Sequence, residues 1–108
     1  MSQNAIPVYS QYPGGLTPIY DIAATGSVKA SNGCLYQIIV QNAGSGGSIT
    51  FSDMLQGGTP AAGNQIITLT TAQLTAAPGG ILKIEWPFKT GLNVSAISGG
   101  IIVNASIA

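Results

Sequence analysis

The chain contains no histidine and no arginine, and only three lysines and three acidic residues occur among its 108 positions. Charged residues make up 6% of the sequence, whereas about 25% is typical of soluble proteins. Without histidine, the commonest general base and metal ligand are missing, so no Ser-His-Asp or Cys-His arrangement can form within one chain. Three lysines make no persuasive phosphate-binding surface. We expect neither catalysis nor nucleic-acid binding.

The cysteine and the acids exclude further kinds of site. Cys34 is the only cysteine, so it cannot form an intrachain disulfide. It falls on the apolar face of a predicted strand, where an inert buried thiol is expected. Asp21, Asp53 and Glu85 are too scattered for a calcium-binding run; Asp53 ends a predicted strand and is expected to accept turn hydrogen bonds, and Glu85 is expected to project outward. We predict no metal, no cofactor and no enzyme activity.

Long apolar runs are also missing. The first residues contain no basic segment followed by an apolar stretch, which is the pattern of a secretory signal. No apolar run approaches the ~18 residues of a membrane helix. We therefore expect synthesis and folding in a reducing cytoplasm, without membrane association.

The polarity of the chain comes from Ser, Thr, Asn and Gln, and its formal net charge is zero. A free monomer of this kind has little electrostatic protection against association. We interpret the composition as that of a subunit that works in an assembly, although a weakly charged soluble domain has the same composition.

Residues 1–18 differ from the rest of the chain. They contain three prolines, a Gly14-Gly15 pair and two tyrosines. Proline removes backbone donors and glycine adds flexibility, so we predict an extended N-terminal arm. Two interpretations are open. The arm lies on a neighbouring subunit with Tyr9, Tyr12 and Pro13 as its interaction residues, or it is an ordinary frayed terminus.

Residues 19–108 alternate between short apolar strands and Gly-rich turns about every ten residues. The predicted strands cover residues 19–23, 27–30, 34–42, 48–52, 65–70, 81–86, 92–97 and 101–107. No segment predicts a convincing helix, and residues 71–77 are expected to form an irregular turn. The fold prediction is all-β: a single β-sandwich of about eight short antiparallel strands, with a jelly-roll arrangement or a small barrel as its possible forms.

Several local expectations follow from this pattern. Residues 44–47 and 98–100 are each expected to close a hairpin between the strands on either side. In the strand over residues 34–42, the even positions are expected to share one face. Pro87 is expected to end the strand over residues 81–86. Trp86 is expected to be the largest core residue; the alternative is an exposed indole that stacks on a sugar ring.

Two stretches, residues 28–42 and 86–95, resemble a known group of proteins. The first reads VKASNGCLYQIIVQN and the second reads WPFKTGLNVS. They are similar to small β-sandwich proteins of tailed bacteriophages, in which a KAS-x-G-x-LY strand start precedes an apolar strand ending in Asn. In that group an aromatic-Pro-Phe-x-Thr-Gly segment then leads into a late strand. The resemblance spans roughly residues 26–97 and rests on turn glycines and core aromatics.

The resemblance implies a structural virion protein that is made in the host cytoplasm. The expected form is a capsid decoration (cement) protein, a homo-oligomer and most simply a trimer, which bridges capsomers by binding the major capsid protein or another virion protein. A tail, neck or fibre-associated protein is one alternative. A carbohydrate-binding module for host recognition is another, from a different class. The resemblance supplies no catalytic residues.

Overall fold

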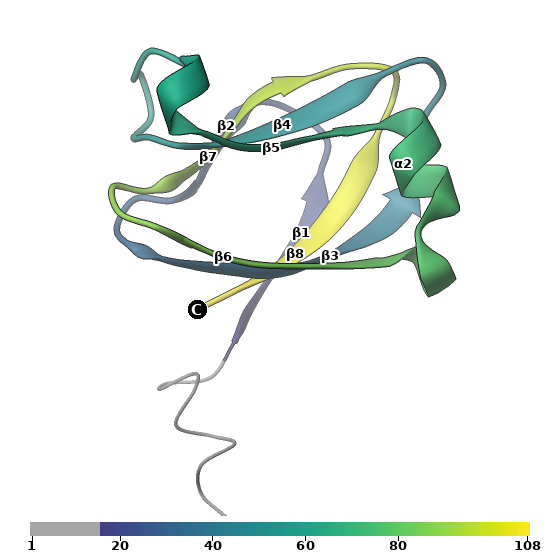
Figure 1. The fold of residues 1–108 in the computed structure, drawn as a ribbon, viewed down its shortest axis with the longest axis horizontal. Coiled ribbons are helices and arrows are strands. Elements are labelled where there is room, and N and C mark those ends of the chain that lie inside the picture. Colours follow the sequence, from purple (N-terminus) through teal and green to yellow (C-terminus); the bar gives the residue numbers. More distant parts are fainter. Residues whose placement is uncertain (1–15) are drawn as a thin grey trace, which may run out of the picture.

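Eight strands account for most of residues 16–108, which are the residues that the computed structural model describes (Figure 1). They are β1 (Thr17–Ile22), β2 (Gly26–Lys29), β3 (Gly33–Asn42), β4 (Ser48–Asp53), β5 (Gln65–Thr70), β6 (Ile81–Phe88), β7 (Leu92–Ile97) and β8 (Ile102–Ile107). The predicted all-β fold is confirmed, and no strand boundary differs from its prediction by more than two residues. Tyr9, Tyr12 and Pro13 lie outside the described residues.

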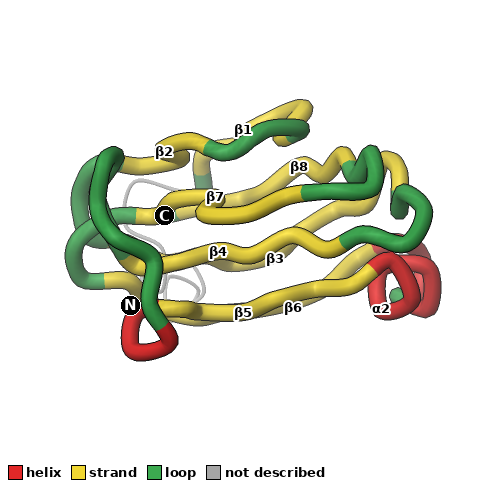
Figure 2. The backbone as a smooth tube through the Cα atoms, turned by 90° about the horizontal axis from the view of Figure 1, so that it is seen from above, coloured by secondary structure: helices red, strands yellow, loops and turns green. Residues whose placement is uncertain are grey.

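The strands form two four-stranded antiparallel sheets, in the orders β1-β8-β3-β6 and β2-β7-β4-β5. Figure 1 shows the sheets as two layers, and Figure 2 shows their strands running in similar directions, one sheet over the other. This is the aligned packing of a β-sandwich. Its edge strands are β1 and β6 in one sheet and β2 and β5 in the other.

Most connections cross from one sheet to the other. Only β4 and β5 are both consecutive in the chain and paired. The prediction of hairpins at residues 44–47 and 98–100 was therefore wrong, because each of these segments connects a strand of one sheet to a strand of the other. The two crossings contact each other: the Ser45 N–H donates to the Gly99 carbonyl over 2.9 Å, and the Ser98 N–H donates to the Ser48 carbonyl over 2.9 Å. A Cβ at Gly47 would lie 2.2 Å from the Ser98 oxygen, so this close approach requires glycine.

A short helix, α2 (Thr71–Ala76), occupies the segment expected to be an irregular turn. Thr70 Oγ1 accepts a hydrogen bond from the Gln73 N–H, and Gln73 Oε1 accepts one from the Thr70 N–H. This reciprocal capping box stabilises the first turn. The helix places Leu74 in the core. Two 3-10 turns flank this region, η2 (Ala62–Asn64) before β5 and η3 (Pro78–Gly80) before β6.

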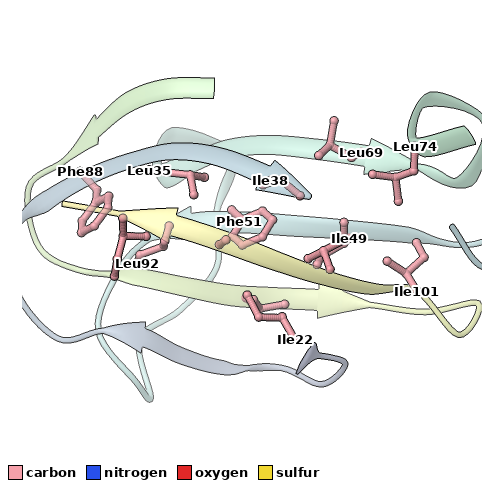
Figure 3. Close-up of a cluster of buried hydrophobic side chains, with 14 residues drawn as sticks. Ile22, Leu35, Ile38, Ile49, Phe51, Leu69, Leu74, Phe88, Leu92 and Ile101 are labelled. Atoms are coloured by element: carbon pink, nitrogen blue, oxygen red, sulfur yellow. The ribbon is translucent and has the colours of Figure 1, made fainter. Parts of the chain in front are cut away.

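Fourteen buried apolar residues form one core between the sheets (Figure 3). Ile49, Phe51 and Leu69 all lie in this core and are buried. Burial of side chains of this size from both layers supplies the main stabilisation of the fold, at about 1.5–3 kcal/mol for each large residue.

Bulges change which residues of β3 face this core. Leu35 and Ile38 are both fully buried, although a regular strand would turn residues three apart to opposite faces. The register of β3 shifts between Leu35 and Gln37 in its pairing with both β6 and β8. Opposite this shift, β6 bulges at Glu85, which has a φ of +50°. The expected face of even positions was therefore wrong for the first half of the strand, where Leu35 rather than Cys34 is buried.

Trp86 is 57% exposed, so the prediction that it is the largest core residue was wrong. It belongs to the edge strand β6, which has β3 as its only neighbour among the described residues. Phe88 takes the core position instead and is 2% exposed. The strand also continues through Pro87, which was expected to end it, because an edge strand tolerates the missing N–H.

Candidate functional site

An open pocket of about 580 Å³ lies at one end of the sandwich. Its lining comes from the turn before β3, from the end of β4, and from the end of β6 with the residue that follows it. We call it the Trp86 pocket; it is lined by Asn32, Gly33, Asp53, Trp86, Pro87, Phe88 and Lys89. The pocket therefore brings together three segments that are far apart in the sequence.

Asp53 holds the loop that leaves β6. Its Oδ2 accepts a hydrogen bond from the Lys89 N–H over 2.8 Å, and its Oδ1 accepts from the N–H groups of Thr90 and Gly91 over 2.8 and 3.3 Å. Burial raises the pKa of the carboxyl, but the three backbone hydrogen bonds and the Lys89 charge together outweigh it and leave the pKa below its ordinary value. Asp53 is therefore ionised at neutral pH, and its expected role as a turn acceptor is confirmed.

The two stretches that carry the sequence resemblance meet at this end of the sandwich. Leu35 in the first stretch pairs with Trp86 in the second, between β3 and β6. Lys29 pairs with Leu92, between β2 and β7. The two stretches therefore pair with each other beside the Trp86 pocket.

The C-terminus closes the same end. The Cys34 N–H donates to the Ala108 carbonyl over 3.1 Å, and Lys29 Nζ donates to the same oxygen over 3.0 Å. A Cβ at Gly33 would lie 2.3 Å from this oxygen, which explains the glycine at the start of β3. This close approach leaves no space for a larger residue at position 33.

Cys34 is half-buried rather than fully enclosed. Burial raises the pKa of its thiol, and the negative charge of Glu85 raises it further. The thiol is therefore protonated at neutral pH and is a poor nucleophile. The expected full burial of Cys34 was therefore wrong, and the inertness of its thiol stays a prediction.

A second surface, the outer face of the β1-β8-β3-β6 sheet, is rich in amide and apolar side chains. Ile39 pairs with Asn104 on one side and with Ile81 on the other, so all three lie on one face. Gln37 pairs in the same way with Ser106 and Lys83. We call this surface the amide face; it comprises Tyr20, Asp21, Gln37, Ile39, Gln41, Ile81, Lys83, Asn104 and Ser106.

Polar groups on the amide face bond to one another. Asn104 Oδ1 accepts hydrogen bonds from the Asp21 N–H over 2.9 Å and from Gln41 Nε2. Gln41 Nε2 also donates to Asp21 Oδ1 over 2.8 Å. Around this network Tyr20 is 68% exposed, and Ile39 and Ile81 are exposed as well. The face thus combines satisfied polar groups with apolar side chains that are open to solvent.

The outer face of the second sheet has a different character, because small hydroxyl side chains cover it. The hydroxyls of Thr50 and Thr68 are 2.9 Å apart, and those of Ser52 and Ser95 are 2.8 Å apart. Asn93 is buried beside Ser52, and its Nδ2 has no hydrogen-bond partner among residues 16–108. This face offers little exposed apolar area.

In the part of the chain that the structure describes, no group of three or more His, Cys, Asp or Glu side chains could hold a metal ion. No helix within those residues is long and apolar enough to cross a membrane. The predicted interaction residues lie in the arm, outside the described residues, and the sequence alone does not group Trp86 with Asp53 and Lys89. The one local signal for this group was the position of Asp53 at a strand end.

Comparisons with protein-family profiles, with curated proteins and with solved structures find no match to the chain.

Proposed function

We propose that this chain is a structural virion protein, and in its most specific form a capsid decoration protein that bridges capsomers as a homo-oligomer. The carrying observation is the amide face, a broad sheet surface with exposed apolar groups and few charged side chains, among them Asp21 and Lys83. The proposal also draws on the resemblance of residues 28–42 and 86–95 to small phage proteins.

The amide face suits burial in an assembly for an energetic reason. Removing a charge from water is costly unless it is paired, and the cores of protein interfaces are depleted in charged residues. Here Asp21, Gln41 and Asn104 already bond to one another. A partner covering them would therefore leave few polar groups unsatisfied, while it would bury Tyr20 and Ile39.

The strand order adds support by analogy. The pairs β1·β8, β2·β7, β3·β6 and β4·β5 are those of one long hairpin that turns between β4 and β5 and is wound into two layers. We infer that this plan is that of a jelly roll, a fold that viral capsid domains and lectin domains use. Because one fold can serve many functions, the analogy supports a virion protein and is also compatible with other functions.

In this function the protein acts through contact area alone. Many copies bound across capsomer boundaries stabilise the assembled shell relative to its free parts, by mass action. An interface of about 800 Å² on each partner is typical of a specific, stable contact. We propose a trimer at symmetry-related positions on the shell.

The test is the position and copy number of the chain in purified virions. Hundreds of copies on full heads support a decoration protein, whereas about a dozen or fewer copies in a ring or spike support the tail, neck or fibre alternative. Absence of the chain from purified virions would contradict both forms.

Two matched variants examine the amide face itself. Ile39→Lys places a charge in the centre of this face and is expected to reduce the copies bound per particle. Ala96→Lys places the same charge on the outer face of the other sheet, where Ala96 is exposed and pairs with Thr50. It is expected to bind like the unmodified chain. Equal binding by both variants would show that the amide face is not the interface.

A further inference from the structure

We propose that the Trp86 pocket binds a neutral saccharide, with the indole of Trp86 stacked on one face of a pyranose ring. This inference goes beyond the proposed virion function and does not depend on it. It rests on three features of the pocket: an exposed indole on a constrained backbone, hydrogen-bond donors and acceptors beside it, and a lining with no net charge.

The first feature is the indole. Trp86 exposes 57% of its surface, although a side chain with this much apolar area gains stability when it is removed from water. Its backbone pairs with β3 at Leu35, and Pro87 directly after it has a restricted φ. The ring is therefore presented from a constrained segment, and little backbone entropy would be lost when a ligand covers it.

The second feature is the set of polar groups. Asp53 is held ionised, and its Oδ2 accepts one hydrogen bond in the structure, from the Lys89 N–H. A carboxylate oxygen can accept two, so Oδ2 has capacity for a ligand hydroxyl. Lys89 and Asn32 line the same pocket, and both have side chains with hydrogen-bond donors. Sugar hydroxyls both donate and accept, so they match this mixture.

The third feature is the charge. One acidic and one basic side chain line the pocket, Asp53 and Lys89, so the charges of the lining sum to zero. A phosphate or another anion would meet the Asp53 carboxylate, and a cation would meet the Lys89 ammonium. A nucleobase could stack on the indole, but its phosphates would find a single lysine beside an acid. A neutral ring with several hydroxyls satisfies the indole and the polar groups together.

The size and openness of the pocket indicate an oligosaccharide rather than one sugar. A volume of about 580 Å³ falls within the range of about 300–1,000 Å³ that is common for ligand sites. One sugar ring on the indole would leave part of this space open to solvent. Further units of a chain can extend from the stacked ring toward Asn32 or Lys89.

Trp86 is the only tryptophan of the chain, so its fluorescence reports on this pocket alone. The experiment titrates the full-length protein with methyl glycosides of glucose, galactose, mannose and N-acetylglucosamine, and then with neutral oligosaccharides of the same sugars. Inorganic phosphate is the charged comparison. The expected result is a saturable shift of the emission to shorter wavelength for at least one neutral sugar, and no shift with phosphate.

Variants distinguish stacking on the indole from nonspecific binding. Their binding is measured by saturation-transfer NMR, because variants without the indole lack its fluorescence. Trp86→Ala is expected to weaken binding about tenfold or more, a change typical of losing one aromatic contact. Trp86→Phe keeps a ring and should retain part of the affinity, and Lys89→Ala should weaken it by about twofold to fivefold. Tyr20→Ala removes an exposed aromatic of the amide face and should bind unchanged.

The proposal is overturned if no neutral sugar in the panel binds, if phosphate alone binds, or if Trp86→Ala binds as tightly as the unmodified chain. The melting temperature of each variant shows that it is folded. Should Trp86→Ala fail to fold, Trp86→Phe and Lys89→Ala decide, and unchanged affinity in both would reject the site. Sugar binding by a chain that is absent from virions would support this inference and contradict the proposed function, so the two fail separately.

Discussion

The backbone N–H of Lys89 donates a 2.8 Å hydrogen bond to Oδ2 of Asp53, which lies 36 residues earlier in the chain. This contact joins the end of β4 in one sheet to the loop after β6 in the other. Together with the hydrogen bonds from Thr90 and Gly91, it fixes the chain beside the Trp86 pocket. The first two predictions follow from it.

Asp53→Ala is expected to lower the free energy of unfolding by about 1–2 kcal/mol, because three backbone donors lose a charged acceptor at a partly exposed site. Asp53→Asn keeps one acceptor oxygen and should cost less. Urea unfolding measures both, with Glu85→Gln as the control for loss of an exposed acid. If Asp53→Ala were no less stable than this control, the hydrogen bonds of Asp53 would not stabilise the fold.

Low pH is expected to lower the free energy of unfolding of the unmodified chain, because it protonates the Asp53 carboxyl. The pKa of Asp53 is lower in the folded chain than in the unfolded one, where about 3.9 is ordinary. Its contribution to stability is therefore fully present above the unfolded pKa and is lost as the pH falls through the lower folded pKa. Urea midpoints measured from pH 7 to pH 2 should fall more for the unmodified chain than for Asp53→Asn. Parallel curves for the two proteins would contradict the assignment.

Two adjacent glycines allow steric crowding to be separated from backbone strain. Gly99 and Gly100 have φ values of +78° and +79°, so both occupy the left-handed region. A Cβ at Gly99 would lie 2.6 Å from the Cα of Gly47, whereas a Cβ at Gly100 would meet nothing within 4 Å. Gly100→Ala should cost about 1 kcal/mol, and Gly99→Ala about 3 kcal/mol because it adds a clash between the two crossings. Thermal unfolding measures the difference, and equal losses would show that the crossings are not in tight contact.

The bulge at Glu85 offers a stabilising substitution. Glu85 is exposed, and its φ of +50° is unfavourable for any residue with a Cβ. Glu85→Gly removes this strain and is expected to raise the free energy of unfolding by about 0.5 kcal/mol, the strain relief less the extra freedom of glycine in the unfolded chain. Glu85→Ala keeps the Cβ and should change stability little. A lower stability for Glu85→Gly than for Glu85→Ala would reject the strained bulge.

Cys34 should react slowly in the folded protein. Burial and the Glu85 charge both raise the pKa of its thiol, so the thiolate fraction at pH 7 is below that of an unfolded cysteine. Labelling with iodoacetamide should be faster in urea than in buffer. Glu85→Gln removes one of the two causes and should speed labelling of the folded chain. An unchanged rate in Glu85→Gln would show that burial alone protects the thiol.

The all-β class and the positions of the eight strands could be read from the sequence, because alternation of apolar residues and Gly- or Pro-containing turns are local signals. The helix α2 also had a local signal, the Thr70-x-x-Gln73 pattern of a capping box, although an irregular turn was predicted there. The role of Asp53 as a turn acceptor was likewise predictable from its place at a strand end.

The pairing of the strands was decided only by the tertiary structure. The apolar pattern of the strands on either side of residues 44–47 is compatible with a hairpin and with a crossing to the other sheet, because both arrangements bury one face of each strand. The choice depends on packing between crossings such as Gly47 and Gly99, which lie far apart in the sequence. The exposure of Trp86 was decided in the same way. Its strand alternates like a buried one, but β6 is an edge strand that bulges at Glu85, and neither property is visible until β3 is placed beside it.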